Sequence, residues 1–477
     1  MTAAAMTEKI SEGPGWYRES AVPAETRPQL TFDLDVDVCV VGGGLAGLSV
    51  AYEAVRRGAS VAVLEAREIG WNASGNNLGT VMPGFGGEIV DLIARIGLHD
   101  TRELWRLTQM GADRIRQMVA TTAMPGVALT DGVLEVSHTD VGDQLVGRLQ
   151  LLGETFGADI EGWPVDRVRA TLRSGRYFHA IHYPTAFHLH ALNYLRGLAV
   201  AAERAGVQIF EQTPVTEIDP AGVRKRIVTP RARLRAGAIV LAGNVHLGAA
   251  FPRLSRTLLP VWRTVAVTGR LGDKLAEAIA YRGTVHDSAG VDHYQVVDGD
   301  RLMWSGPVTT WATDPRRFAR RVSRRIQAVY PQLKRVRIID MWGGTTGETV
   351  HGMPQIGQLG RGLWIASGFG AQGLATTAMA GDLLASGMLE RDDRWRLFSP
   401  FELVWTGGLA GRVAGQAVYS WQRGQATVAG MLARYREQAN ARRQQREASR
   451  AVANQAVRRM RVEPHGAHPR APSDAAD

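Results

Sequence analysis

The chain has 477 residues, 45% of them apolar, and a formal net charge of +10. This length and apolar content exclude a disordered or fibrous protein and predict a large core divided over two or more domains. The single cysteine, Cys39, excludes an intramolecular disulfide and a cysteine-built metal cluster, so redox chemistry has to come from a bound cofactor, and no metal site is predicted.

Residues 1–30 are expected to form an N-terminal arm before the first strand. They contain no charged segment followed by an apolar one, as a secretory signal would require. No apolar run in the chain reaches the roughly 18 residues needed to span a bilayer. We therefore expect a cytoplasmic protein.

The clearest motif is residues 36–65, which read VDVCVVGGGLAGLSVAYEAVRRGASVAVLE. The run Val36–Val41 predicts a buried parallel strand, residues 45–57 predict a helix that stops at Gly58, and Val61–Leu64 predicts a second strand. A strand, glycine turn, helix and strand in this order are typical of a Rossmann-type dinucleotide-binding domain.

Each glycine of this turn has a separate task. Gly42 allows the tight turn out of the strand, Gly44 lets backbone amides approach a pyrophosphate, and Gly47 lets the helix pack closely on the strand. The helix begins with Leu45 and Ala46. Its N-terminus offers free N–H groups to the phosphates.

Glu65 ends the second strand, where it is placed to accept hydrogen bonds from ribose hydroxyls. A carboxylate at this position disfavours a 2′-phosphate because two negative charges would meet. The motif by itself thus leaves NAD and FAD as candidate cofactors.

The segment after Glu65 separates these two cofactors. Residues 69–79, IGWNASGNNLG, are rich in glycine and asparagine where a plain NAD domain would begin another helix. This segment resembles the loop that lies against the flavin in the D-amino acid oxidase (DAO) family of FAD-dependent amine oxidoreductases. Further motifs resemble this family, and most closely its γ-glutamylputrescine oxidase-like branch: Trp16-Tyr17, FHLHALN at 187–193, GVQIFEQ at 206–212, IVLAGNVH at 239–246, WGG at 342–344, MPQIG at 353–357 and SGFGAQG at 367–373.

The resemblance implies FAD as the cofactor. A covalent link to the flavin is not expected, because Cys39 lies in the first strand and residues 71–80 contain no histidine. The residues expected to bind FAD lie in the glycine turn, the loop after it and the later strand ends: Gly42, Gly44, Leu45, Ala46, Gly47, Glu65, Ala66, Ser74, Gly75, Asn76, Asn77, Leu78, Gly79, Val215, Ala242, Gly243, Gly344, Gly368, Gly370, Ala371, Gln372 and Gly373.

Three positions depart from the family pattern. Asn76 stands where relatives often have arginine, Leu78 replaces a usual glycine, and Gln372 stands where the γ-glutamylputrescine branch has histidine. The substrate within the branch is therefore left open.

A second GxGxxG, at residues 368–373, follows the predicted strand Leu363–Ala366 and precedes a predicted helix at 374–386. An independent NAD site would need a second strand before the next acid, Glu390, and the sequence predicts none. The resemblance implies instead that this helix N-terminus faces the flavin N1–C2=O region, where negative charge gathers during reduction.

The sequence predicts an α/β protein with a discontinuous Rossmann-type FAD-binding domain of residues 31–95, 175–250 and 335–395. The intervening residues 96–174 and 251–334 are assigned to an α+β substrate domain, whose sheet the resemblance implies to be antiparallel. Its expected elements are helices at His99–Thr121, Gly142–Thr155 and Asp314–Tyr330 and strands at Thr264–Arg270 and Leu302–Ser305.

Residues 396–477 are expected to be a basic C-terminal extension with a helix at 426–460 and a disordered tail. From Trp421 to Asp477, eleven arginines stand against five acidic residues. A solvated surface helix and a helix that contacts an anionic partner, lipid or RNA, remain open, and nucleic acid is the less expected partner. Residues 396–420, rich in glycine and tryptophan, are expected to pack on the core or to join a membrane-surface contact.

Amine oxidation by a flavin needs little side-chain chemistry, because the flavin N5 accepts the hydride and the protein orients the substrate and excludes water. The candidate substrate contacts are His351, Tyr294, Trp304 and Gln372, together with Arg263, which could hold a carboxylate. Each could equally have a structural role, and no acid or base is assigned with certainty.

We therefore expect an FAD-dependent oxidoreductase acting on the C–N bond of a small amine or amino acid. The alternatives are a dehydrogenase of a hydroxy acid or polyol with the same fold, and a membrane- or RNA-associated flavoprotein. The electron acceptor is O2 or a quinone. In the sarcosine-oxidase branch a lysine beside the flavin assists O2, whereas the matching strand here has Leu302, Met303 and Trp304, which favours a dehydrogenase.

Overall fold

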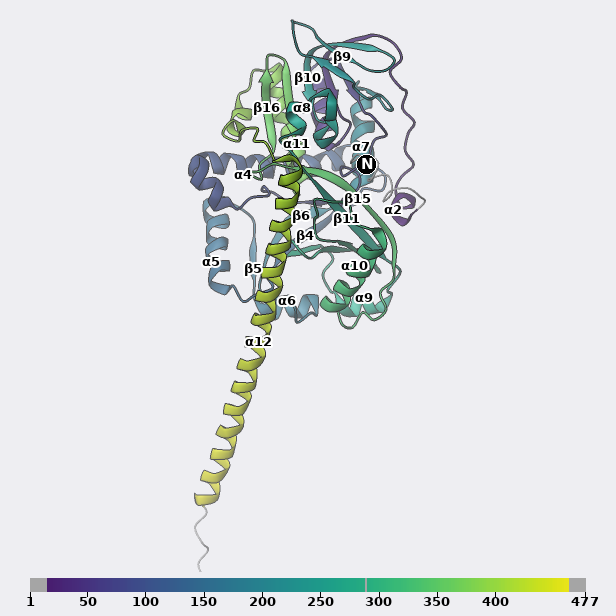
Figure 1. Ribbon diagram of the computed structural model, residues 1–477. Coiled ribbons are helices and arrows are strands. Elements are labelled where there is room, and N and C mark those ends of the chain that lie inside the picture. Colours follow the sequence, from purple (N-terminus) through teal and green to yellow (C-terminus); the bar gives the residue numbers. More distant parts are fainter. Residues whose placement is uncertain (1–14, 288–289, 463–477) are drawn as a thin grey trace, which may run out of the picture. The chain divides into compact units, whose positions relative to one another are not determined.

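The computed structural model describes residues 15–287 and 290–462 (Figure 1). The chain divides into a compact unit, Met1–Ala426, and a second unit, Thr427–Asp477. The predicted flavin and substrate domains both lie within the first unit, which contains two sheets.

The first sheet is built around parallel strands whose carboxyl ends meet at one edge. Val41 of β1 pairs with Leu64 of β2 on one side and with Leu241 of β10 on the other, so the ends of these three strands are level. The strand order is β16-β17-β10-β1-β2-β7, with antiparallel β9 and β8 beyond β10. The strands are β1 (Leu34–Val41), β2 (Val61–Leu64), β7 (Gln208–Phe210), β8 (Glu217–Asp219), β9 (Lys225–Val228), β10 (Arg233–Leu241), β16 (Gln355–Gly360) and β17 (Leu363–Ser367).

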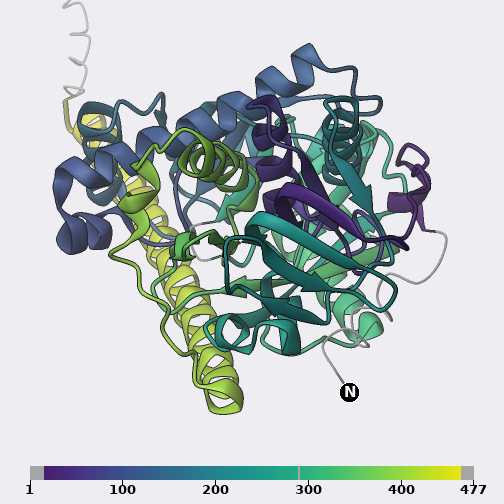
Figure 2. The same ribbon diagram turned by 90° about the horizontal axis from the view of Figure 1, so that it is seen from above.

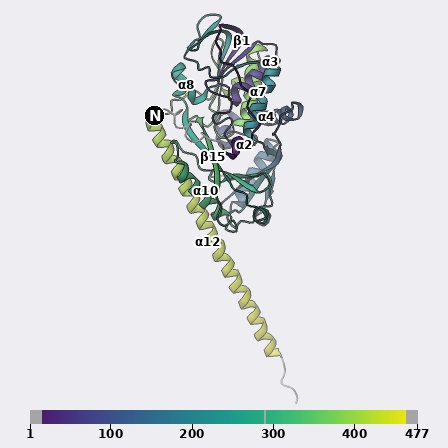
Figure 3. The same ribbon diagram turned by 90° about the vertical axis from the view of Figure 1, so that its right-hand side faces the viewer.

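Helices cover both faces of this sheet because its central strands are apolar on both sides. Val38, Val40 and Val63 pack under one layer of helices, whereas Cys39 and Ile239 face the other layer. Figures 2 and 3 show this arrangement, with α3, α4, α7 and α11 on one side and α8 on the other. These helices are α3 (Leu45–Arg56), α4 (Ile89–Thr121), α7 (Ala191–Arg204), α8 (Pro252–Ser255) and α11 (Gly373–Leu389), and a 3-10 segment η2 (Asn244–Ala250) leads into α8.

The second sheet is antiparallel except for the pair β4 and β12, which largely confirms the expected antiparallel substrate sheet. Its order is β15-β11-β14-β13-β12-β4-β6-β3, with β5 paired to β6. The strands are β3 (Thr80–Val81), β4 (Thr130–Val136), β5 (Glu161–Trp163), β6 (Ala180–His188), β11 (Leu259–Thr268), β12 (Thr284–Asp287), β13 (His293–Val297), β14 (Arg301–Ser305) and β15 (Ile338–Glu348). The helices α5 (Gly142–Gln150), η1 (Leu151–Thr155), α6 (Val165–Leu172), α9 (Asp273–Ala278) and α10 (Pro315–Val329) accompany it.

The predicted segment boundaries need one correction. β3, β6 and β15 come from residues assigned to the flavin domain, yet they pair in the second sheet. Pairing between strands that are distant in sequence decides to which sheet each strand belongs. The order of segments along the chain does not show it.

Two predicted helices differ from the structure at their starts. α4 begins at Ile89, ten residues before the predicted His99, but Gly97 has φ +83 and interrupts it, so the regular part after this kink matches the prediction. The C-terminal helix α12 (Gly408–Val462) begins well before the predicted residue 426. Gly408, Gly411 and Gly415 lower its local helix propensity, and hydrogen bonds to the core outweigh this cost.

Residues 396–420 pack on the core only in part. η3 (Arg394–Phe398) and the residues after it bury Phe398 and Phe401, whereas Trp405 and Leu409 are 66% and 67% exposed. Among the described residues, no helix combines the length and the apolar character needed to pass through a bilayer. The tail predicted to be disordered after residue 462 lies outside the described residues.

The N-terminal arm contributes α2 (Trp16–Glu19), which is fastened to the loop after β2. The Tyr17 ring stacks on His190 and on Trp342, and its hydroxyl donates a hydrogen bond of 2.6 Å to the carbonyl oxygen of Gly75. The arm therefore helps to hold the glycine- and asparagine-rich loop in place.

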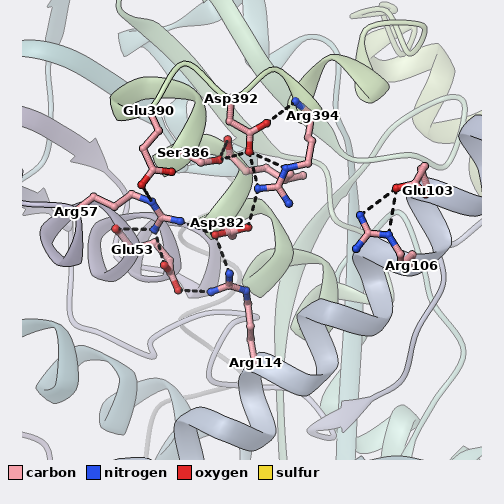
Figure 4. Close-up of polar contacts among 11 residues, drawn as sticks. Glu53, Arg57, Glu103, Arg106, Arg114, Asp382, Ser386, Glu390, Asp392 and Arg394 are labelled. Atoms are coloured by element: carbon pink, nitrogen blue, oxygen red, sulfur yellow. Dashed lines mark hydrogen bonds and ion pairs between the residues drawn. The ribbon is translucent and has the colours of Figure 1, made fainter.

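A charged network joins three of the helices on one face of the parallel sheet (Figure 4). Asp382 of α11, 3% exposed, forms ion pairs with Arg57 of α3 at 2.6 Å and Arg114 of α4 at 2.8 Å, and a longer one with Arg394. Glu53 of α3 pairs with the same Arg57 and Arg114. Each charged group thus has a partner of opposite charge, and the network ties α3, α4 and α11 together.

Candidate active site

The glycine turn between β1 and α3 leaves no space for side chains. Gly42 has φ +110, and a Cβ there would lie 2.9 Å from the backbone of Ala242 and Gly243. A Cβ on Gly47 would lie 1.9 Å from the carbonyl oxygen of Gly42, which confirms its predicted packing role. The N-terminus of α3 is thereby brought to the edge where the parallel strands end.

A cavity of about 190 Å³ opens beside this turn, and Glu65 lies in its wall. Glu65 accepts hydrogen bonds from the backbone N–H groups of Gly43, at 2.7 Å, and Arg67, at 2.9 Å, and from Trp71 Nε1 at 3.0 Å. Burial raises the pKa of this carboxyl group, although these hydrogen bonds oppose the shift. The carboxylate oxygens are thus held toward the cavity with acceptor capacity left for hydroxyl groups.

A second cavity, of about 310 Å³, continues from the first. Gly44, Ala73, Ser74, Ala242 and Asn244 line both cavities, so the glycine turn lies at their junction. The far end of the second cavity runs between the antiparallel sheet and the N-terminus of α11. A two-ended ligand with phosphates in its middle fits this layout.

Four buried polar atoms in the lining of these cavities have no hydrogen-bond partner among the described residues. An unpaired polar atom in a buried site is costly unless a ligand or water satisfies it. The second cavity is therefore built for a polar ligand. The atoms are Asn244 Oδ1, Arg263 Nε, His286 Nε2 and Gln372 Oε1.

The second glycine cluster brings the N-terminus of α11 to this cavity. Gly370, Gln372 and Gly373 line it, and no side chain caps the helix, so its first N–H groups face the cavity edge. The described residues after Leu389 contain no strand, in agreement with the prediction that no second nucleotide-binding unit follows.

Most of the residues predicted to bind FAD line one of the two cavities, and four do not. Gly47 packs α3 on the turn, and Gly75 lies where a Cβ would meet the carbonyl oxygen of Gly70 at 2.6 Å. A Cβ on Gly344 would be 2.3 Å from Ala73, and one on Gly368 would be 2.8 Å from Thr349. These glycines permit close packing around the site.

Of the five predicted substrate contacts, the structure brings Arg263 and Gln372 to the second cavity. Arg263 forms an ion pair of 2.5 Å with Glu348. His351 instead stabilises its own turn, since its Nδ1 accepts a hydrogen bond from the Met353 N–H.

Tyr294 and Trp304 lie on the wrong face of the antiparallel sheet for substrate contact. Their rings stack at 4.2 Å inside the core, and the Tyr294 hydroxyl is hydrogen-bonded to that of Tyr330. Side chains alternate along a strand, so the neighbouring residues, His293 and Ser305, face the cavity.

Sequence reasoning missed two histidines that line the second cavity, His286 and His293. Their rings are 5.8 Å apart on the paired strands β12 and β13. Burial, assisted by nearby positive groups, lowers the pKa of His293 to about 3, so this imidazole is neutral. The alternation of side chains along residues 293–297, HYQVV, could have indicated that His293 and Tyr294 face opposite sides of the sheet. The sequence did not show which of these sides meets the flavin.

The two ends of a dinucleotide would fill the two cavities, and its pyrophosphate would lie at the glycine turn between them. The fold and the site therefore define a dinucleotide-binding protein. The sequence matches the DAO family model, described as FAD dependent oxidoreductase, over residues 37–386. The chain belongs to this family, and its cofactor is FAD. Cys39 is buried in β1 and lines neither cavity, in agreement with a flavin held without a thioether.

Curated relatives extend this result. The chain is 30% identical over 401 residues to gamma-glutamylputrescine oxidoreductase of Escherichia coli K12, covering 83% of this chain and 92% of the relative. It is 25% identical over 387 residues to glycine oxidase of Geobacillus kaustophilus, covering 77% of this chain and 96% of the relative.

Solved structures show the same fold. The crystal structure of glycine oxidase from Geobacillus kaustophilus aligns with a TM-score of 0.64 at 22% identity, covering 78% of this chain and 99% of that one. L-proline dehydrogenase from P. horikoshii aligns with a TM-score of 0.64 at 18% identity, covering 77% and 96%.

Proposed function

We propose that this protein oxidises the C–N bond of a small amine or amino acid. The observation that carries the proposal is the second cavity, where unsatisfied polar atoms of Arg263, His286 and Gln372 belong to residues that line it but not the first cavity. The relatives named for amine and amino-acid oxidation support it. When bound, FAD supplies the hydride acceptor at its N5.

The protein's own groups would bind and orient the substrate. The free N–H groups at the start of α11 favour negative charge at the cavity edge, where the helix dipole is positive. Gln372 offers its amide to the substrate, and Arg263, which is paired with Glu348, offers its remaining N–H groups. Since the nearby His293 imidazole is neutral, it adds no positive charge that would repel an ammonium group.

An anaerobic screen of primary and secondary amines tests this function. The adjacent nitrogen lone pair must assist loss of hydride from carbon, so the neutral amine is the reactive form. We expect the bound flavin to bleach with at least one such amine, and to bleach faster at about pH 9 than at about pH 7, because more of the amine is neutral.

NADH and NADPH serve as controls and are expected to leave the flavin yellow. Rapid bleaching by NADPH would contradict the proposal. Bleaching by hydroxy acids alone would favour the alternative, a dehydrogenase of hydroxy acids. The electron acceptor is O2 or a quinone. The described lining of the second cavity contains no lysine of the kind that assists O2 in the sarcosine-oxidase branch, and this supports a dehydrogenase over an oxidase.

We also propose that the C-terminal region makes a peripheral contact with an anionic membrane. In the first unit, Trp405, Leu409 and Trp421 are each about two-thirds exposed. The second unit is rich in arginine by sequence. Exposed tryptophan and leucine together with basic residues are typical of segments that lie in the membrane interface.

Co-sedimentation with lipid vesicles tests this contact. We expect binding to phosphatidylglycerol vesicles at least about tenfold stronger than to phosphatidylcholine vesicles, because basic residues attract anionic lipid. The double variant Trp405→Ser/Trp421→Ser should lose most of this binding. Val223→Ser, which removes an exposed apolar side chain between β8 and β9, should not. Equal binding to both lipids would contradict the contact.

A further inference from the structure

One segment of the compact unit holds nearly as much positive charge as the whole chain. Residues 315–339 contain nine basic residues and no acidic one, so they carry +9, whereas the chain as a whole carries +10. Residues 421–477 carry a further +6, so all the remaining residues together are net negative. The nine basic residues are Arg316, Arg317, Arg320, Arg321, Arg324, Arg325, Lys334, Arg335 and Arg337. The positive charge of the compact unit is therefore concentrated in one place.

The helix α10 turns most of this charge to solvent. Its apolar side chains, including Phe318 and Ile326, are buried, and Arg325 next to them pairs with Asp292 at 2.5 Å. The other arginines of α10 follow one another at steps of one or three residues, so they share the opposite side of the helix. We term this side the basic face, which consists of the exposed residues Arg316, Arg317, Arg320, Arg321 and Arg324.

The basic face has no acidic counterpart in the part of the chain that the structure describes. None of its five arginines forms an ion pair with a described residue. Exposed arginines elsewhere do, as Arg116 does with Asp131 at 2.7 Å. Like charges four residues apart, such as Arg316 and Arg320, destabilise a helix. An anionic partner lying across this face would remove that repulsion.

Exposed tryptophans belong to the elements next to the basic face. Trp311, just before α10, is 40% exposed, and the Arg412 guanidinium lies 4.0 Å from the centre of its ring. The Thr310 N–H donates to Gln416 Oε1 at 3.0 Å, which fastens this segment to α12. The same part of α12 exposes 68% of Trp421. Arginine and tryptophan on neighbouring elements are typical of a surface that meets lipid headgroups.

The basic face also lies behind the substrate end of the site. Gly306 lines the second cavity, and a Cβ on it would lie 2.2 Å from the ring of Phe318. Because Phe318 is on the buried side of α10, only this helix separates the cavity wall from the basic face. A partner bound to α10 would therefore lie about one helix diameter, roughly 10 Å, from the wall of the cavity.

We propose that the basic face of α10 docks the protein on a membrane surface that contains anionic lipid. The inference takes its partner from the membrane contact proposed for the C-terminal region and rests on that proposal, but it assigns the electrostatic attraction to the compact unit. The arginines lie against the lipid phosphates, and the tryptophans of the neighbouring elements enter the headgroup layer. Docking in this way holds the substrate end of the site close to the membrane.

Co-sedimentation of the full-length holoenzyme with vesicles of phosphatidylglycerol and phosphatidylcholine in equal parts tests this assignment. The test variant combines Arg316→Gln, Arg317→Gln, Arg320→Gln, Arg321→Gln and Arg324→Gln. We expect its vesicle Kd to rise at least about thirtyfold, because several arginines close to an anionic surface act together. Glutamine is a good helix former, so the FAD content and the circular dichroism spectrum should match those of the wild type.

Two control variants separate the position of the charge from its amount and from the shape of the side chain. Lysine at the same five positions keeps the charge and should leave the vesicle Kd within about threefold of the wild type. Glutamine at five exposed arginines around the first sheet changes the net charge equally and should also leave the Kd within about threefold. These arginines are Arg204, Arg231, Arg233, Arg235 and Arg361.

Each outcome decides for or against the basic face. Wild-type binding by the α10 variant, or equal weakening by the control around the first sheet, would overturn the inference. Loss of binding in Trp405→Ser/Trp421→Ser alone would leave the contact of the C-terminal region standing without α10. No binding of the wild type to these vesicles would overturn both proposals. A single-stranded RNA of about 20 nucleotides that binds more tightly and displaces the vesicles would assign the basic face to nucleic acid instead.

Discussion

Replacing Gly44 by valine is expected to yield a protein without FAD, with bound cofactor reduced at least about tenfold. A Cβ at this position would lie 2.8 Å from Ser74 Oγ, at the junction of the two cofactor cavities. The φ of Gly44 is −78, which any residue can adopt, so the expected loss comes from the occupied space and not from backbone strain. The ratio of flavin to protein absorbance in the purified variant measures it.

Gly147→Val is the matched control. Gly147 lies on exposed α5, and a Cβ there meets no atom within 4 Å. This variant should carry as much FAD as the wild type. A yellow, fully loaded Gly44→Val protein would show that the pyrophosphate does not pass this turn.

Replacing Asp382 by asparagine is expected to lower the free energy of unfolding by about 3 kcal/mol. The substitution keeps the shape of the side chain but removes the buried negative charge that Arg57, Arg114 and Arg394 share (Figure 4). Arg57 and Arg114 would then share one buried carboxylate, that of Glu53, in place of two. Urea unfolding of the holoenzyme, followed by circular dichroism, measures the change.

Glu103→Gln provides the control from the same figure. Glu103 pairs with Arg106 on the surface of α4, where the side chains are 40% and 54% exposed. Solvent screens such a pair, so the change should stay within about 0.5 kcal/mol. Equal effects of the two substitutions would contradict a structural role of the buried network.

The sequence by itself determined the nucleotide-binding end of the site. Residues 36–65 form β1, α3 and β2 as predicted, and Glu65 lies at the cavity wall. This succeeded because the relevant forces are local: glycine conformations, apolar periodicity and a helix N-terminus act within thirty consecutive positions. The helix after the second glycine cluster was predictable for the same reason.

The substrate end of the site was decided by long-range pairing. Tyr294 and Trp304 are predicted substrate contacts, but the pairing of β13 with β14 turns both side chains into the core and turns His293 toward the cavity. A shift of one residue reverses the face of every side chain on a strand. No local pattern states which face will meet the cofactor.

The C-terminal helix shows most clearly which features the local sequence determines and which depend on tertiary contacts. Its basic composition and helical character were readable in the sequence, but its start at Gly408 was not, because three glycines weaken the local signal. Hydrogen bonds from Thr310 to Arg412 and Gln416 stabilise those first turns. These tertiary contacts, across about a hundred residues of chain, help to place Tyr419 and Arg423 in the lining of a cavity of about 300 Å³. Contacts so distant in sequence are set by the packed fold and not by local propensity.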